Sequence, residues 1–220
     1  MRKPDLWKDV RRFECSRGAQ PHSLSLSRGG ATLAMDTFYD GIMVTNIWNT
    51  QDAKRTAGID GACIGCLSPE GKKVFVAKGK DVVAYEFQEG KPEARDTFTG
   101  HTAAISCVTC SLDGKYVAAS SSSPTNVVRV WYVETGKPLD HFKRHSQGIT
   151  CIRFAPDGKR LLSATGDGVL RIYDVQTGSI VHETPPQAAA ILGATFTPGG
   201  GRAVFGMSDG TIKVWQLPSP

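Results

Sequence analysis

The sequence predicts an all-β protein made of about five four-stranded antiparallel sheets that stack radially like blades. Short runs of alternating apolar and polar residues, such as ITCIRF and VLRIY, are typical of strands. A tight turn follows the leading strand of each unit at intervals of 41 to 44 residues, at Gly29, Glu70, Asp113, Asp157 and Gly199. A regular period of this length indicates five copies of one supersecondary unit.

The composition is that of a soluble globular protein of 220 residues, with 40% apolar and 21% charged residues. The formal net charge is +5, and six basic residues gather near the N-terminus, at Arg2, Lys3, Lys8, Arg11, Arg12 and Arg17. The first residues lack the apolar core of a secretory signal, and no apolar run is long enough to cross a membrane. We therefore expect a cytoplasmic protein without a membrane partner.

The domain organisation follows from the period. Residues 1–9 form a basic lead-in, and residues 10–217 form the repeat domain, with repeats at about 22–57, 62–98, 101–142, 145–183 and 187–217. Each repeat supplies three inner strands, and outer strands are expected at residues 10–14, 53–57, 93–98, 138–142 and 178–183. In the first repeat, two extra residues between Asp40 and Trp48 predict a bulge or a longer turn.

The leading strands indicate where the core lies. Aligned on their turns, they share one mostly apolar position, at Leu26, Leu67, Cys110, Phe154 and Phe196, and a second two residues earlier, at Leu24, Gly65, Val108, Ile152 and Ala194. Residues two apart on a strand face the same way, so these positions predict a buried face. The opposite face also carries apolar residues, so we expect each sheet to be covered on both sides.

Two CxxC pairs, Cys63 with Cys66 and Cys107 with Cys110, raise the question of a metal site. Both pairs fall on expected strands, where residues three apart point to opposite faces and cannot chelate one ion without breaking the strand. The pattern therefore predicts small buried thiols in a reducing compartment and neither a metal nor a cofactor.

The repeats resemble the tryptophan-aspartate (WD) repeat family of β-propellers. The resemblance is carried by Gly100-His101 leading to Val130-Trp131, by His145 leading to Tyr173-Asp174, by the run DGTIKVW that ends at Trp215, and by the DGK turns. It extends from about residue 10 to residue 217, and several motifs recur at one period, which makes it specific.

The resemblance implies a hydrogen-bonded network within each blade, formed by a histidine, a serine or threonine, an aspartate and a tryptophan. The matching residues here are His101, Ser120 and Trp131 in the third repeat, His145, Ser163 and Asp167 in the fourth, and Asp209 and Trp215 in the fifth. Tyr173 replaces the tryptophan of the fourth repeat. Such a network satisfies buried polar groups, so we expect these residues to be structural and none to be catalytic.

Five repeats leave the closure of the ring open. An outer strand at residues 10–14 could complete the last blade and close a five-bladed ring. Alternatively, Leu6 and Trp7 resemble the tail of an earlier blade, and the family most often has about seven blades. We favour the incomplete propeller, whose two exposed apolar faces predict oligomerisation or a missing partner segment.

The sequence favours a non-catalytic interaction scaffold that binds a protein or peptide through its top face and loops, within a multiprotein complex. The candidate contact residues are Tyr39, Lys80, Thr102, Ser146 and Arg153. One alternative is a nucleic-acid-binding subunit that uses the basic cluster, although no aromatic residues are interleaved with it. A propeller enzyme is a further alternative, but no pair of carboxylates and no nucleophile with a base converges in the pattern.

Overall fold

The computed structural model describes residues 12–15, 18–61, 63–88, 91–121, 123–139, 142 and 145–217. Sheet 1 contains β1 (Gln20–Leu26), β2 (Thr32–Tyr39), β3 (Ile42–Asn49) and β4 (Arg55–Asp60). Sheet 2 contains β5 (Cys63–Leu67), β6 (Lys73–Lys78), β7 (Asp81–Gln88) and β8 (Lys91–Phe98). Sheet 3 contains β9 (Ile105–Cys110), β10 (Tyr116–Ser121), β11 (Val128–Tyr132) and β12 (Pro138–Leu139). Sheet 4 contains β13 (Ile149–Phe154), β14 (Arg160–Thr165), β15 (Leu170–Asp174) and β16 (Ile180–Glu183), and sheet 5 contains β17 (Ile191–Phe196), β18 (Arg202–Met207) and β19 (Ile212–Gln216).

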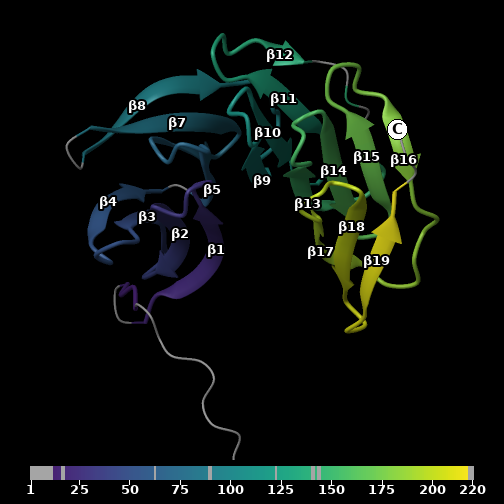
Figure 1. Cartoon of the computed structure of the whole chain (residues 1–220), viewed down its shortest axis with the longest axis horizontal. Helices are drawn as coiled ribbons and strands as arrows, with labels where there is room; N and C mark the ends of the chain where they lie inside the picture. The colour runs from purple at the N-terminus through teal and green to yellow at the C-terminus, as the bar shows by residue number, and fades with distance from the viewer. Residues whose placement is uncertain are drawn as a thin grey trace, which may run out of the picture.

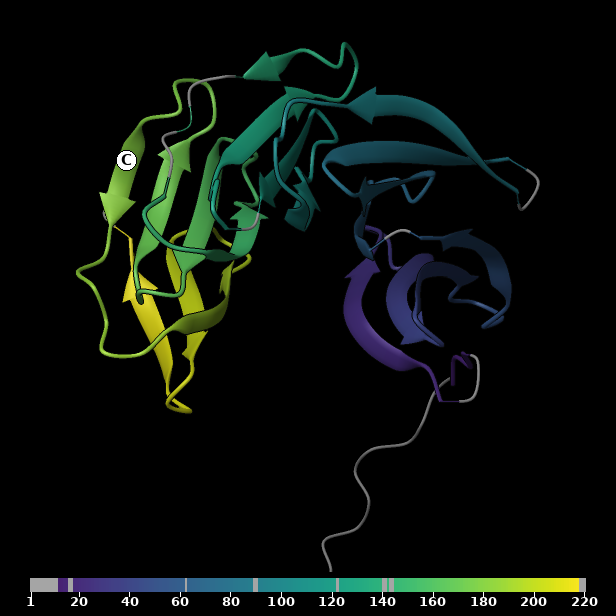
Figure 2. The ribbon, with the colours of Figure 1, turned by 180° about the vertical axis from the view of Figure 1, so that it is seen from behind.

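The all-β architecture of about five antiparallel sheets is confirmed. Figures 1 and 2 show the sheets side by side in an open arc, with the leading strands β1, β5, β9, β13 and β17 along its inner side. Within the described residues every regular element is a strand, and none of them is a helix that could cross a membrane. The arc is a partial propeller whose sheets do not close into a ring.

The same hydrogen bond holds the first turn in each of the first three repeats. A serine before the turn accepts a hydrogen bond from the backbone N–H five residues later: Ser27 from Thr32, Ser68 from Lys73 and Ser111 from Tyr116, each at 3.0 Å. These bonds hold the two strands at the start of each hairpin, which is why the period is so regular.

The pairing of β2 with β3 shows neither the bulge nor the longer turn expected between Asp40 and Trp48, although the pairing of β3 with β4 shifts register between Ile47 and Trp48. Strands β2 and β3 pair without interruption from Thr32 to Tyr39. Asp40 and Gly41 form a two-residue turn with φ of 49° and 79°, values that suit a tight hairpin. The β2–β3 hairpin has eight residue pairs, against six in β6–β7 and five in β14–β15, so the extra residues lengthen the hairpin itself.

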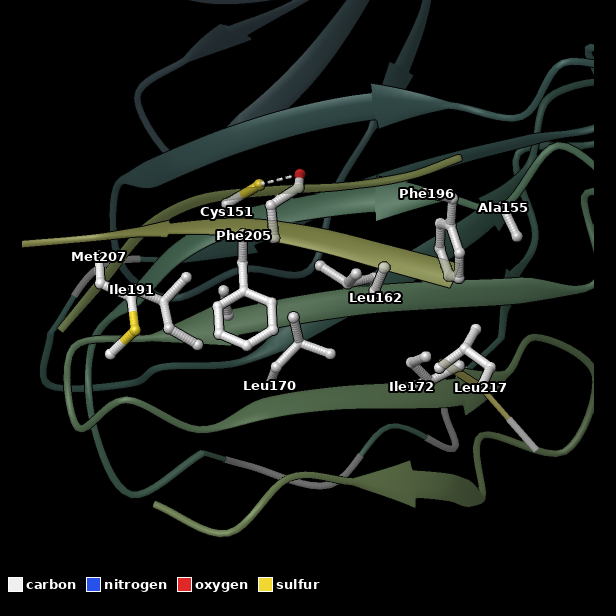
Figure 3. Close-up of a cluster of buried hydrophobic side chains, with 13 residues drawn as sticks. Cys151, Ala155, Leu162, Leu170, Ile172, Ile191, Phe196, Phe205, Met207 and Leu217 are labelled. Atoms are coloured by element: carbon white, nitrogen blue, oxygen red, sulfur yellow. Dashed lines mark hydrogen bonds between the residues drawn. The ribbon is translucent and has the colours of Figure 1, made fainter. Parts of the chain in front are cut away.

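The core consists of apolar layers between neighbouring sheets. Trp131 and Phe98 lie between sheets 2 and 3, both 1% exposed, with ring centroids 6.0 Å apart. Figure 3 shows the layer between sheets 4 and 5, in which Leu170 lies beside Phe205 and Ile172 lies beside Leu217. The expected covering of both faces therefore holds for the inner sheets. It fails at the outward faces of sheets 1 and 5.

The expected outer strand at residues 10–14 is wrong for its described part. Residues 12–15 form no strand, and residues 10 and 11 lie outside the described residues, as do Leu6 and Trp7. The ring of Phe13 lies edge-on to Trp48 at 6.3 Å, so this segment packs on sheet 1 rather than completing sheet 5. Sheet 5 accordingly has three strands among the described residues.

Candidate functional site

The leading strands of sheets 1 to 4 line a groove of about 750 Å³ on the inner side of the arc. Its lining combines hydroxyl groups, thiols and one guanidinium, and it consists of His22, Ser23, Leu24, Ser25, Leu26, Gly65, Cys66, Leu67, Ser106, Cys107, Val108, Thr109, Cys110, Leu112, Thr150 and Arg153. Among these lining residues none carries a carboxylate. The groove is therefore a polar concave surface with one fixed positive charge.

Hydroxyl groups in the groove wall link neighbouring sheets. The backbone N–H of Leu67 donates to Ser25 Oγ at 3.0 Å, across sheets 2 and 1. Thr150 Oγ1 donates to the carbonyl of Ile191 at 2.7 Å, across sheets 4 and 5. These bonds satisfy polar groups that would otherwise lie unpaired beside apolar layers, and they hold the groove wall in place.

Thiols make the same kind of link. Cys110 Sγ donates to the carbonyl of Leu67 at 2.9 Å, Cys107 Sγ to that of Thr150 at 3.4 Å, and Cys151 Sγ to that of Ala194 at 3.3 Å. Cys107 and Cys110 pack on opposite sides of sheet 3, as the strand period predicts. Among the described residues, no three side chains of His, Cys, Asp or Glu gather as a metal site requires.

Burial keeps the thiols of Cys66 and Cys107 protonated. It raises the pKa of Cys66 well above its usual value, and the contact with Cys110 raises it further. Burial also raises the pKa of Cys107. The positive charge of Arg153 acts in the opposite direction on both thiols, although it does not outweigh burial. The arrangement therefore suits packing and hydrogen bonding rather than nucleophilic chemistry at neutral pH.

One buried carboxylate escaped the sequence analysis. Asp36, 1% exposed, accepts hydrogen bonds from the hydroxyls of Ser23 and of Thr45, the latter at 2.6 Å, and from the backbone N–H of Gly65 at 2.8 Å. It takes the position in β2 that Ala164 takes in β14. A carboxylate at a position that packs against the next sheet was the available signal, and it indicates a polar link between sheets 1 and 2.

In the fourth repeat, His145 Nε2 lies 2.8 Å from Ser163 Oγ and 2.9 Å from the hydroxyl of Tyr173. Asp167, the fourth expected member, instead accepts hydrogen bonds from the hydroxyls of Thr165 and Ser146. Burial acts to raise the pKa of Asp167, but these hydrogen bonds and one from the backbone of Val169 outweigh it and lower the pKa. Asp167 therefore fixes the turn, while the histidine, serine and tyrosine form the buried contact.

In the third repeat, Ser120 does not meet His101. Ala119, not Ser120, occupies the position equivalent to Ser163, because the turns that precede β10 and β14 align Tyr116 with Arg160. Ser120 therefore faces the other side of the sheet, where its hydroxyl lies 3.0 Å from that of Ser106. The expected grouping of His101, Ser120 and Trp131 requires this correction, and its cause is a shift of one residue along a strand.

His101 still packs against the tryptophan of its repeat. The two rings lie 5.7 Å apart, and Trp131 Nε1 donates to the carbonyl of Thr99 at 3.2 Å. Burial lowers the pKa of His101 to about 4, and the charge of Arg129 lowers it as well. Burial likewise lowers the pKa of His145 to about 4, together with the charge of Arg171. Both histidines are thus neutral near pH 7.

In the fifth repeat, Asp209 and Trp215 have separate structural roles. Asp209 accepts hydrogen bonds from the backbone N–H and hydroxyl of Thr211, at 2.9 and 2.7 Å, which fixes the turn between β18 and β19 and lowers the pKa of Asp209. Trp215 is half-buried against the core of sheets 4 and 5.

The candidate contact residues fall into two groups. Tyr39 ends β2, Lys80 lies in the turn between β6 and β7, and Thr102 and Ser146 lie in the loops that precede β9 and β13. All four are exposed, at the ends of the sheets where the second turns lie. Arg153, in contrast, is the penultimate residue of β13 and lines the groove. Of the five candidate contact residues, Arg153 is thus the one that lines the groove, and the other four lie outside its lining.

Comparison with known families decides the identity of the repeats. Residues 93–132 and 136–174 match the WD domain, G-beta repeat. The chain contains two WD repeats. Each matched WD repeat begins with the outer strand of one sheet and continues with three strands of the next, because β8 and β12 belong to sheets 2 and 3. A WD repeat therefore ties two neighbouring sheets together covalently.

Three relatives illustrate the similarity. The chain is 34% identical over 96 residues to WD repeat-containing protein 1 of Gallus gallus, which covers 42% of this chain and 15% of the relative. It is 36% identical over 69 residues to Periodic tryptophan protein 2 of Arabidopsis thaliana, and this match covers 31% of this chain and 7% of the relative. It is 35% identical over 82 residues to Eukaryotic translation initiation factor 3 subunit I of Homo sapiens, and this match covers 37% of this chain and 24% of the relative. The matches therefore span less than a quarter of the length of each relative.

Proposed function

We propose that this WD-repeat chain is a non-catalytic scaffold that holds a protein or peptide partner through its inner groove and the adjoining top-face turns. WD-repeat proteins generally act as interaction scaffolds, and the buried histidines and thiols described above are engaged in packing. The scaffold works in the cytoplasm, where a reducing environment keeps its cysteines as thiols. Like the relative named as a subunit of translation initiation factor 3, it acts within a multiprotein assembly.

The groove with Arg153 is the observation that carries this proposal. Many of the groove's hydroxyl and thiol groups already bond to neighbouring strands, so the wall is pre-formed and a partner meets a rigid surface. The guanidinium of Arg153 stands among lining residues without a carboxylate. An extended segment with an acidic side chain is the partner chemistry that this charge favours.

The test is an affinity capture from cell extract with three forms of the chain. We expect the wild type to retain one reproducible set of proteins, Arg153→Glu to lose it, and Lys137→Glu to keep it. Lys137 is exposed in the turn between β11 and β12, so the control makes the same charge change away from the groove. Equal retention by all three forms would contradict the role of the groove.

The same experiment separates the nucleic-acid alternative. Most of the basic cluster, Arg2, Lys3, Lys8, Arg11 and Arg17, lies outside the described residues. A protein partner held by the groove survives nuclease treatment of the extract. Loss of the captured set on nuclease treatment, together with a steep decline of binding with salt, would favour nucleic acid instead.

A further inference from the structure

The outward face of sheet 5 has the make-up of an interior face. Ile212 and Val214 are 75% and 61% exposed. They take the positions in β19 that Leu170 and Ile172 take in β15, and both of those residues are 0% exposed because sheet 5 covers them. Figure 3 shows Leu170 and Ile172 in that covered layer. The outward face of sheet 5 thus has apolar residues at the same positions as the face of sheet 4 that packs against sheet 5.

The outward face of sheet 1 is its counterpart. Leu24 and Leu26 are 63% and 54% exposed. They take the positions in β1 that Ala194 and Phe196 take in β17, where both residues pack against sheet 4 and are no more than 9% exposed. Sheet 1 therefore presents the face with which each later sheet packs on its predecessor. Phe13 covers part of this face, at Trp48, and leaves the two leucines exposed.

The two faces are thus the two halves of one contact that the chain already makes between its own neighbouring sheets. They lie at opposite ends of the arc, which Figures 1 and 2 show open between β1 and the strands of sheet 5. A second copy of the chain carries the matching half for each face. Because the halves differ, such a contact is head-to-tail and not symmetric.

We propose that the outward face of sheet 1 in one copy packs on the outward face of sheet 5 in another. The contact continues the series of sheet-on-sheet layers from one molecule into the next, and it removes from water the exposed leucines of β1 and the isoleucine and valine of β19. Leu24 and Leu26 also line one end of the groove, so the contact on sheet 1 adjoins the groove, whereas the contact on sheet 5 uses residues outside the groove lining.

The test uses two variants that each block one face, and light scattering on a size-exclusion column. Ile212→Asp with Val214→Asp blocks sheet 5, and Leu24→Asp with Leu26→Asp blocks sheet 1. Wild type is expected to exceed the monomer mass of 23.6 kDa, increasingly so at higher concentration. Each variant alone is expected to be monomeric. An equimolar mixture is expected to form a species of twice the monomer mass, because each variant retains the half that the other lacks.

A matched control replaces two exposed apolar residues elsewhere, Ile180→Asp with Val181→Asp on β16, and is expected to associate like wild type. Circular dichroism with a thermal melt verifies that every variant folds. A wild-type chain that stays monomeric at all concentrations would overturn the proposal. So would self-association of either blocked variant, which indicates a symmetric contact, or failure of the two folded variants to pair.

Discussion

The hydroxyl of Tyr173 lies 2.9 Å from His145 Nε2, at the position where the WD pattern places a tryptophan. Tyr173 is 1% exposed and His145 4% exposed, so the contact is closed to solvent. A tyrosine can fill the space of the larger ring and also supply a polar partner for the histidine. The substitution that departs from the family pattern thus preserves the buried contact with different chemistry.

Removing that hydroxyl should therefore weaken the fold. Tyr173→Phe leaves His145 with one fewer partner in a buried site, and we expect a loss of about 1 kcal/mol in the free energy of unfolding, measured with urea. Tyr132→Phe is the control, because its hydroxyl makes an exposed hydrogen bond to Gln176, at 3.5 Å. Equal losses for the two variants would contradict a stabilising role for the Tyr173 contact.

Stability should fall as the pH is lowered from about 6.5 to about 4. The folded pKa values of His101 and His145 are about 4, below the usual 6.5, so the unfolded chain binds more protons in this window. The stabilisation is complete above pH 6.5, and each histidine adds a slope of at most about 1.4 kcal/mol per pH unit as protons bind.

Urea midpoints across this pH range provide the measurement. His145→Gln is expected to flatten the dependence, since it removes one of the two proton-binding groups. The lowered pKa values of Asp167 and Asp209 act in a separate, more acidic window, where stability present above pH 3.8 is lost. Stability that does not change between pH 6.5 and 4 would contradict the burial of neutral histidines.

Asp36 should contribute more to the free energy of unfolding than a surface carboxylate does. Asp36→Ala leaves the backbone N–H of Gly65 and the hydroxyl of Thr45 without their acceptor, and we expect a loss of about 2–3 kcal/mol in unfolding free energy. Asp60→Ala removes an exposed carboxylate from the same sheet and should change stability by less than about 0.5 kcal/mol. The idea fails if the two substitutions cost the same.

A comparison of the tryptophans of sheets 3 and 5 tests whether the edge strand β19 is left uncovered. Trp131 is 1% exposed between two sheets, and Trp131→Ala should cost about 3–5 kcal/mol. Trp215 takes the matching position in sheet 5 but is only half-buried. Trp215→Ala should therefore cost less than half as much in the same chemical denaturation experiment. A larger cost for Trp215 would mean that β19, an edge strand of sheet 5 among the described residues, is covered in solution.

The repeated sheets could be predicted from the sequence because they arise from local patterns. The alternating runs and the turns at Asp113 and Asp157 act over a few residues, so the period predicts sheets 3 and 4 directly. Other features depend on single-residue register. Ser120 resembles Ser163 in type and lies in the same strand of its repeat, but a shift of one residue turns it to the opposite face. Counting from the turn aspartates gives the same shift, because Ser120 follows Asp113 by seven residues and Ser163 follows Asp157 by six.

The ends of the arc were harder to predict for a tertiary reason. Residues 12–15 lie beside sheet 1 because the ring of Phe13 contacts Trp48, and no local pattern favours that sheet over sheet 5. Asp36 was missed because its partners, Ser23, Thr45 and Gly65, come from three different strands. Such groupings depend on how strands stack, which alternation alone does not specify.

The most direct test of the open five-sheet propeller is amide hydrogen exchange read strand by strand. It should use a monomeric form in which both outward faces are blocked by the aspartate substitutions at Leu24, Leu26, Ile212 and Val214. The open arc predicts that β10 and β14, in the covered sheets 3 and 4, exchange slowest and that β1 and β19 exchange fastest. Protection of β1 and β19 equal to that of β10 would contradict the account, because it would mean that the two ends meet in a closed ring.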